Sequence, residues 1–197
     1  MANKMDIVNM AMANLGADFI GSLDEPGKEA AMIKYHFDTT LGDILSSYSW
    51  GFAFRRASLA PFPEKPLGCD YAYAYPADCV KALRVRPECR DVSCVFEVGR
   101  SPDGRQKAVL TDCPPVAWIE YITRLVDVSE LPDKFVEAFS WRLSAAIALG
   151  VNNDPSTYQL HMQTYGLLRE EARALDASEV HFPRLPDGGF LKSRLGI

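Results

Sequence analysis

The chain has 197 residues, a length that suits one domain or one domain carrying an insertion. Its composition, 48% hydrophobic and 24% charged, is ordinary for a globular protein and allows a sizeable core without disulfides or a metal. The formal net charge of -5 argues against broad electrostatic binding to nucleic acid, which requires a basic face. It does not argue against a protein that surrounds DNA without gripping it.

Two helices are expected in the N-terminal part, residues 1–49. A short apolar helix from Met5 to Leu15 is followed by Gly16, and glycine commonly ends helices. A longer helix is predicted for residues 28–48, because apolar residues recur there at spacings of three and four. Its apolar face contains Ile33, Phe37, Leu41, Ile44 and Tyr48.

The middle of the chain, residues 50–128, is expected to form short antiparallel strands. Aromatic and β-branched residues are enriched there with a period of two, and turn signals separate the segments. One of these signals, Asp103-Gly104, indicates a hairpin. Strands are predicted near residues 51–59, 71–75, 79–86, 92–98, 106–111 and 115–123. The first of these segments follows Trp50 and would place Trp50, Phe52 and Phe54 on one side of an extended chain.

The helical period returns after Ser129. One helix is predicted up to Leu149, with Gly150 ending it, and a last helix is predicted for residues 155–177. The predicted buried stripe of the last helix contains Tyr158, His161 or Met162, Tyr165, Leu168, Ala172 and Leu175.

Residues 179–197 are expected to form an extended C-terminal arm, because they show neither a helical nor a strand period. The segment is too apolar for a solvated linker, and from Val180 onward it has three positive side chains and one negative. We therefore expect the arm to dock on its own body, a neighbouring subunit or a partner. The candidate contact residues are Phe182, Arg184, Phe190, Leu191, Arg194 and Leu195.

Together these elements predict an α+β fold. Short helices cannot bury their apolar stripes alone, so the N- and C-terminal helix pairs should pack together. The prediction is a four-helix bundle formed by residues 1–49 and 129–178, with an antiparallel β region, residues 50–128, inserted into it.

The sequence offers no motif of an enzyme active site. Patterns of phosphate loops, dinucleotide-binding turns, zinc proteases and nucleophile elbows are absent, and His36, His161 and His181 lie far apart along the chain. A small hydrolase with an unrecognised cysteine or carboxylate site is a weaker alternative. We predict no catalytic, cofactor-binding or metal-binding residues.

The cysteines and tyrosines each allow a second interpretation. Five cysteines cannot all pair within the chain, and Cys89, Cys94 and Cys113 suit reduced, buried thiols better than zinc ligands. Three alternate tyrosines could stack on single-stranded nucleic acid, but aromatic packing between strands or subunits fits an acidic chain better. These tyrosines are Tyr71, Tyr73 and Tyr75.

Two motifs occur in a distinctive order. The first leads out of the second predicted helix and consists of a Trp-x-Phe stretch followed by basic residues, namely Trp50, Phe52, Arg55 and Arg56. The second is a turn before a strand, formed by Tyr75, Pro76, Asp78 and Cys79. The later stretch "YITRLVDVSELPDKFVEAFSWRLSAAIA" reads as a strand, an acidic loop with Leu-Pro, and a helix with alternating aromatic and alanine faces.

The order and spacing of these motifs resemble the tail tubular protein A family, the head-to-tail adaptors of short-tailed phages. The resemblance covers roughly residues 5–178, and its specificity comes from the order of the motifs rather than from any catalytic fingerprint. One departure is that Tyr75 takes the apolar position before the proline, where the family has leucine. The segment after residue 178 has no clear match.

The resemblance implies a structural virion protein rather than an enzyme, without a cofactor. Such proteins form a ring, usually of about twelve copies, between the portal protein and the tail nozzle protein. The ring extends the channel through which double-stranded DNA leaves, without sequence recognition, and tail fibres are a further candidate partner. The expected location is the portal-tail junction of the virion, after synthesis in the host cytoplasm. No membrane partner is expected, since no signal-peptide core or membrane-length apolar stretch is recognised.

The first motif also predicts a structural role. Trp50, Phe52 and Phe54 are expected to pack where the helical bundle meets the inserted strands. Arg55 and Arg56 would point to opposite sides of a strand, which leaves one of them for a neighbour's carboxylate or for solvent. The alternative function is a generic α+β protein-interaction module that forms a small oligomer in another assembly.

Overall fold

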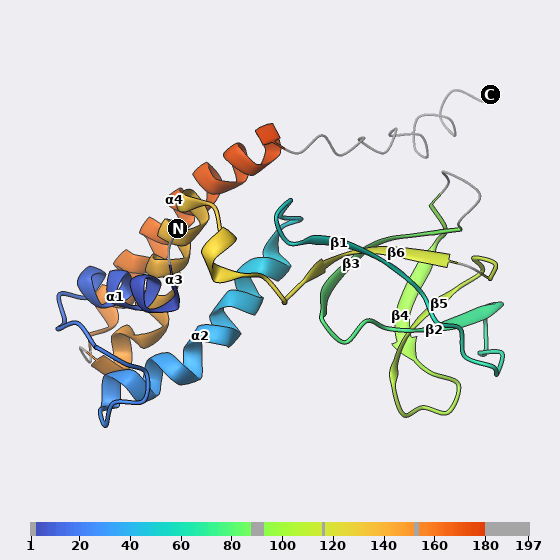
Figure 1. Cartoon of the computed structure of the whole chain (residues 1–197), viewed down its shortest axis with the longest axis horizontal. Coiled ribbons are helices and arrows are strands. Elements are labelled where there is room, and N and C mark those ends of the chain that lie inside the picture. The colour runs from blue at the N-terminus through green and yellow to red at the C-terminus, as the bar shows by residue number, and fades with distance from the viewer. Residues whose placement is uncertain (1–2, 88–92, 116, 152–153, 180–197) are drawn as a thin grey trace.

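The computed structural model describes residues 3–87, 93–115, 117–151 and 154–179. These residues form an α+β fold with four α-helices, one short 3-10 helix and two small antiparallel sheets. The helices lie at one end of the molecule and the sheets at the other (Figure 1). Every strand comes from the stretch of chain between the second and third helices.

The third helix is the centre of the helical part. It packs against each of the other three helices, and the ring of Phe139 on it lies 5.0 Å from that of Phe37 on the second helix. The helices are α1 (Lys4–Asn14), α2 (Lys28–Ser47), α3 (Asp133–Val151) and α4 (Pro155–Glu179), and the 3-10 helix η1 (Val128–Glu130) precedes α3.

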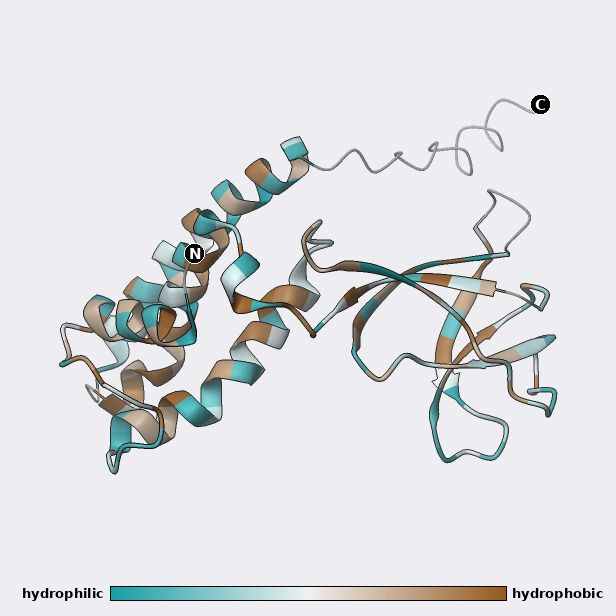
Figure 2. Ribbon diagram, in the orientation of Figure 1, coloured by the Kyte–Doolittle hydropathy of each residue, from teal (hydrophilic) through white to brown (hydrophobic). Residues whose placement is uncertain are grey.

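Local sequence explains why the N-terminal helices form where they do. Asn3 and Asp6 make a reciprocal capping box at the start of α1, and Gly16 follows its end at a φ of 67°. On α2 the predicted apolar face is confirmed, since Ile33, Phe37, Leu41 and Ile44 are buried and Tyr48 is partly buried. Figure 2 shows hydrophobic and hydrophilic residues alternating along α2 and α4, as expected of amphipathic helices.

The C-terminal helices differ from the prediction in two respects. Gly150 does not end α3, which continues to Val151; a Cβ at this position would collide with the Met32 side chain of α2. The glycine therefore lies inside the helix, where it leaves room for the end of the flexible Met32 side chain, and does not mark a stop. On α4, His161, Tyr165 and Ala172 are buried as predicted, but Tyr158 and Leu175 are exposed.

The strands form two three-stranded antiparallel sheets. Sheet A has the order β1-β6-β3 and sheet B the order β2-β5-β4, so in each sheet the strand that comes last in the sequence is the central one. Strands β4 and β5 form the hairpin that Asp103-Gly104 predicts, with Gly104 at a φ of 72°. The strands are β1 (Phe54–Ser58), β2 (Tyr71–Ala74), β3 (Cys79–Pro87), β4 (Phe96–Arg100), β5 (Lys107–Thr111) and β6 (Ala117–Thr123).

Strand β6 takes part in two hydrophobic cores. Ile119 and Tyr121 point into the core between the sheets, while Ile122 packs into the helical core. Trp118 and Glu120 alternate with Ile119 and Tyr121 and lie, like Ile122, on the other side of the strand, the outer face of sheet A. At Ile122 this face meets the helical core, and further along the strand it carries Glu120 and Trp118.

Candidate interaction site at the junction of helices and sheets

Trp50 lies at the junction between α2 and sheet A. Its side chain is 1% exposed, and its Nε1–H donates a hydrogen bond of 3.0 Å to the Ile44 carbonyl oxygen at the end of α2. Its ring lies edge-on to the rings of Tyr48, at 4.9 Å, and Phe135 of α3, at 5.0 Å. The tryptophan thus joins the end of α2 to the start of α3.

The segment after Trp50 is a turn and not the extended strand that the alternating aromatics predict. The Ala53 and Phe54 amides donate to the carbonyl oxygens of Trp50 and Gly51, each at 3.2 Å, and β1 begins only at Phe54. The turn buries Ala53 completely and brings Phe52 to within 4.8 Å of the Phe135 ring. Short-range turn bonds therefore override the period of two, because they let Trp50 and Phe52 contact the same helix.

Phe54, Arg55 and Arg56 belong to sheet A. Phe54 is partly buried, and the Arg56 guanidinium lies 5.4 Å from the centre of its ring. Arg55 is exposed and donates to the neighbouring Phe54 carbonyl oxygen. Arg56 instead donates through Nε to Glu120 on β6, at 3.1 Å. The two arginines thus have different partners.

Glu120 is the centre of an arginine cluster that the sequence did not indicate. Its side chain is only 5% exposed and forms ion pairs with three guanidinium groups. Arg56 lies on β1, whereas Arg84 (Nε to Oε2, 3.9 Å) and Arg86 lie on β3. The cluster, defined as Arg56, Arg84 and Arg86 around Glu120, ties both edge strands of sheet A to its central strand. Because the arginines are 34 or more residues away from Glu120 along the chain, only the pairing of the strands brings them together.

The second motif also holds sheet A together. The Asp78 carboxylate accepts hydrogen bonds from the hydroxyls of Tyr121, at 3.0 Å, and Thr123, at 2.6 Å. Burial and the neighbouring Asp78 raise the pKa of Tyr121 to about 12. The Cys79 thiol donates to the Tyr75 hydroxyl at 3.1 Å, and burial raises the pKa of this thiol. A thiol with a raised pKa is a poor nucleophile, so the geometry favours a structural role for the motif.

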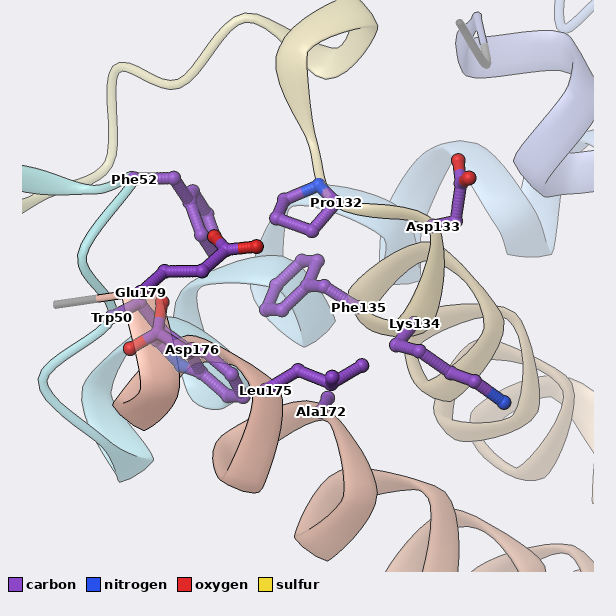
Figure 3. Close-up of a pocket in the computed structure, with 10 residues that line it drawn as sticks. All are labelled: Trp50, Phe52, Pro132, Asp133, Lys134, Phe135, Ala172, Leu175, Asp176 and Glu179. Carbon is purple, nitrogen blue, oxygen red and sulfur yellow. The ribbon is translucent and has the colours of Figure 1, made fainter.

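A pocket of about 480 Å³ opens beside Trp50, and we call it the junction pocket (Figure 3). Its volume is within the range of sites that bind small ligands, roughly 300–1,000 Å³. Figure 3 shows the Phe135 ring near its centre, while the Lys134 ammonium points away from the aromatic side chains. The lining residues are Trp50, Phe52, Pro132, Asp133, Lys134, Phe135, Ala172, Leu175, Asp176 and Glu179.

Asp176 is the most unusual group in this pocket. The Gly51 amide donates a hydrogen bond of 2.9 Å to its Oδ1, but its buried Oδ2 has no hydrogen-bond partner among the described residues. Burial is the main reason that the pKa of Asp176 lies above the ordinary aspartate value; the Gly51 amide lowers this pKa and the charge of Glu179 raises it. The junction pocket therefore combines an aromatic wall with a carboxylate that has room for one more donor.

Other sequence hypotheses find less support in the geometry. Tyr73 is completely buried and donates to the Cys113 and Pro114 carbonyl oxygens at 2.9 and 3.0 Å, so its ring is not available for stacking on a base. Among the residues that the structure describes, no group of three potential metal ligands occurs. Cys89, one of the three candidate zinc ligands, lies outside them.

The remaining site residues of the prediction belong to the arm. Phe182, Arg184, Phe190, Leu191, Arg194 and Leu195 lie outside the described residues, which end with Glu179. Within those residues, no helix is long and apolar enough to cross a membrane.

Comparison of the sequence with protein-family models and with curated proteins finds no match. The resemblance to tail tubular proteins therefore stays a prediction that depends on the motifs.

Sequence reasoning missed both buried carboxylates. The alternating Arg84 and Arg86 indicate two arginines on one face of a strand, but nothing in the sequence identifies Glu120 as their partner. The partner of Asp176 is a backbone amide 125 residues away, for which no side-chain pattern exists.

Proposed function

We propose that this chain is a structural virion protein, a head-to-tail adaptor that forms a ring between the portal protein and the tail nozzle. The ring would extend the DNA ejection channel at the portal-tail junction. The protein would act as a connector and carry no catalytic activity.

The observation that supports this proposal is the structural use of both motifs of the resemblance. Trp50 and Phe52 contact α3 and thereby orient the sheets relative to the helices. Asp78 binds two hydroxyls of β6 and fixes the start of β3 against the central strand. Both motifs thus hold secondary-structure elements in fixed positions, as the shape of a connector requires.

In this proposal the four helices act as one bundle and the β region is its insertion. A closed ring needs heterologous contacts, in which one face of a subunit meets a different face of the next. The C-terminal arm and the arginine cluster on the outer face of sheet A would supply two of these faces. The acidic net charge suits a channel, because a basic lining would retain the phosphates of DNA.

The decisive experiment is a measurement of mass by light scattering, for the protein alone and after mixing with the portal protein from the same genome. A ring of about twelve subunits of 21.9 kDa would have a mass of about 263 kDa. We expect this mass for the protein alone, or a fixed number of subunits bound to each portal. A monomer or dimer that ignores the portal would overturn the proposal.

Deletion of residues 180–197 tests the role of the arm in the same assay. We expect the truncated chain to lose binding to the portal and the nozzle, while its circular dichroism spectrum and cooperative unfolding show that it still folds. A truncated protein that docks with unaltered affinity would show that the arm has no part in assembly.

The alternative, an interaction module of a small oligomer, is favoured by the exposed side of α4. Leu160 and Leu167 lie two turns apart on this helix and are both exposed. A stable dimer that is lost on the paired change of both leucines to Gln, and that does not respond to the portal, would support the alternative.

A further inference from the structure

The junction pocket lies where the described chain stops. Glu179, the last described residue and the end of α4, is one of its lining residues. In Figure 3 the Asp176 and Glu179 side chains lie on the same side of the pocket as Trp50 and Phe52. A segment that continues from Glu179 therefore begins at the edge of a pocket with an aromatic wall and an acidic rim.

The pocket contains a hydrogen-bond acceptor, Asp176 Oδ2, that its own lining does not satisfy. Asp176 is 8% exposed, and a buried carboxylate oxygen without a donor is costly. Lys134 is the cation among the lining residues, and its ammonium already donates to Glu137 and Glu171, at 3.1 and 3.2 Å. A donor for Asp176 Oδ2 must therefore come from outside the described lining.

The next residues of the chain have the chemistry that the pocket lacks. The sequence after Glu179 is Val-His-Phe-Pro-Arg-Leu-Pro, which supplies an aromatic side chain at Phe182 and a guanidinium at Arg184. Asp176 lies three residues before Glu179, about 4.5 Å back along the helix axis. Five residues of extended chain reach up to about 17 Å, so Arg184 can return to Asp176 after a reversal.

We propose that residues 180–186 dock in the junction pocket of their own chain, with Phe182 against Phe52 and Leu175 and with Arg184 donating to Asp176 Oδ2. A segment tethered at the rim of its site has an effective concentration in the millimolar range, which favours the same chain over a second copy. The inference is independent of the adaptor function. It divides the arm into a first part held by the subunit and a remainder, residues 187–197, that is left for a partner.

The test is NMR spectroscopy of the full chain with labelled leucine methyl groups. We expect cross-relaxation between the Phe182 ring and the Leu175 methyl groups. Phe182→Ala should shift the Leu175 methyl signals because the ring current is lost, whereas the matched change Phe190→Ala should leave them in place. Asp176→Asn should move the signals part of the way towards their positions in the Phe182→Ala protein.

Two results would overturn the inference. Leu175 signals that respond equally to the Phe182 and Phe190 changes, or to neither, would show that the pocket does not hold this segment. Cross-relaxation found only between labelled and unlabelled chains in a mixed sample would assign the pocket to the arm of a second copy. Neither result bears on the mass of the complex with the portal, so failure of this inference and failure of the adaptor function are distinguishable.

Discussion

Glu120 on the outer face of sheet A and Asp176 in the junction pocket are both buried carboxylates, but their surroundings differ. Glu120 has three arginine partners on two strands, so its charge is more than balanced within the sheet. Asp176 has one backbone donor and an oxygen that no described group reaches. The arginines of sheet A therefore satisfy the Glu120 carboxylate, whereas the Asp176 carboxylate can still accept a hydrogen bond from a ligand.

The two regions therefore contribute differently to stability and to binding. In sheet A the polar contacts connect three strands that the sequence separates, and their loss should loosen the fold. At the junction the fold depends on aromatic packing around Trp50, and the polar group beside it is available for binding. The predictions below separate the two contributions, starting with the largest effect.

Truncation of Trp50 should be the most damaging single change. Trp50→Ala removes a fully buried ring that contacts Tyr48 and Phe135, so we expect a loss of about 3–5 kcal/mol in the free energy of unfolding. Urea denaturation followed by circular dichroism measures this loss.

The matched control is Trp118→Ala on the outer face of sheet A. Trp118 is 39% exposed, so its truncation should cost no more than about 1–2 kcal/mol. Equal losses in the two variants would show that the junction is not a stabilising joint.

Neutralisation of Glu120 should have the next largest effect. Glu120→Gln leaves three guanidinium groups close together without a countercharge, but Arg56 is 61% exposed and can be hydrated. We therefore expect a loss of about 2–3 kcal/mol in the free energy of unfolding, below the full cost of breaking a buried pair. Glu97→Gln, an exposed position on strand β4, is the control and should be close to neutral.

Replacement of the Asp176 carboxylate by an amide should have a smaller effect on the free energy of unfolding. Burial raises the pKa of Asp176, so its charge is held less favourably in the fold than in water, and Asp176→Asn keeps an oxygen for the Gly51 amide. We expect a free energy of unfolding within about 1 kcal/mol of the original protein, in the same urea assay. A loss as large as that of Glu120→Gln would contradict the contrast between the two regions.

A buried histidine should give the helical part a weaker, pH-dependent contribution. His161 lies 3.0 Å from the Ser144 hydroxyl, and burial lowers its pKa below the ordinary value of 6.5. The unfolded chain therefore takes up the proton at a higher pH than the folded one, so stability is full above pH 6.5 and is lost as the pH falls through the folded pKa.

Unfolding midpoints in urea between pH 7.5 and about 5 measure this loss. His161→Gln should flatten the profile, and His36→Gln on α2 should retain it. A profile that keeps its slope without His161 would assign the pH dependence to other groups.

Local pattern was sufficient to predict most of the elements. The apolar face of α2 repeats at three and four residues, and the strands lie between the turn signals of the middle of the chain. The mixed α+β character follows from the two kinds of period. For α4 the buried stripe was predicted only in part, because Leu175 fits the helical period but is exposed beside the junction pocket.

The sequence by itself therefore determined the types and approximate positions of the helices and strands, since these depend on neighbours a few residues apart. The tertiary structure alone decided that Trp50 starts a turn, that Gly150 lies inside a helix against Met32, and that Glu120 and Asp176 are buried. Each of these features depends on contacts between segments that are distant in the sequence. Such contacts produce no periodic pattern of residues along the chain. The physical reason is that packing and the pairing of charges act across space, whereas periodicity records only which face of an element is buried.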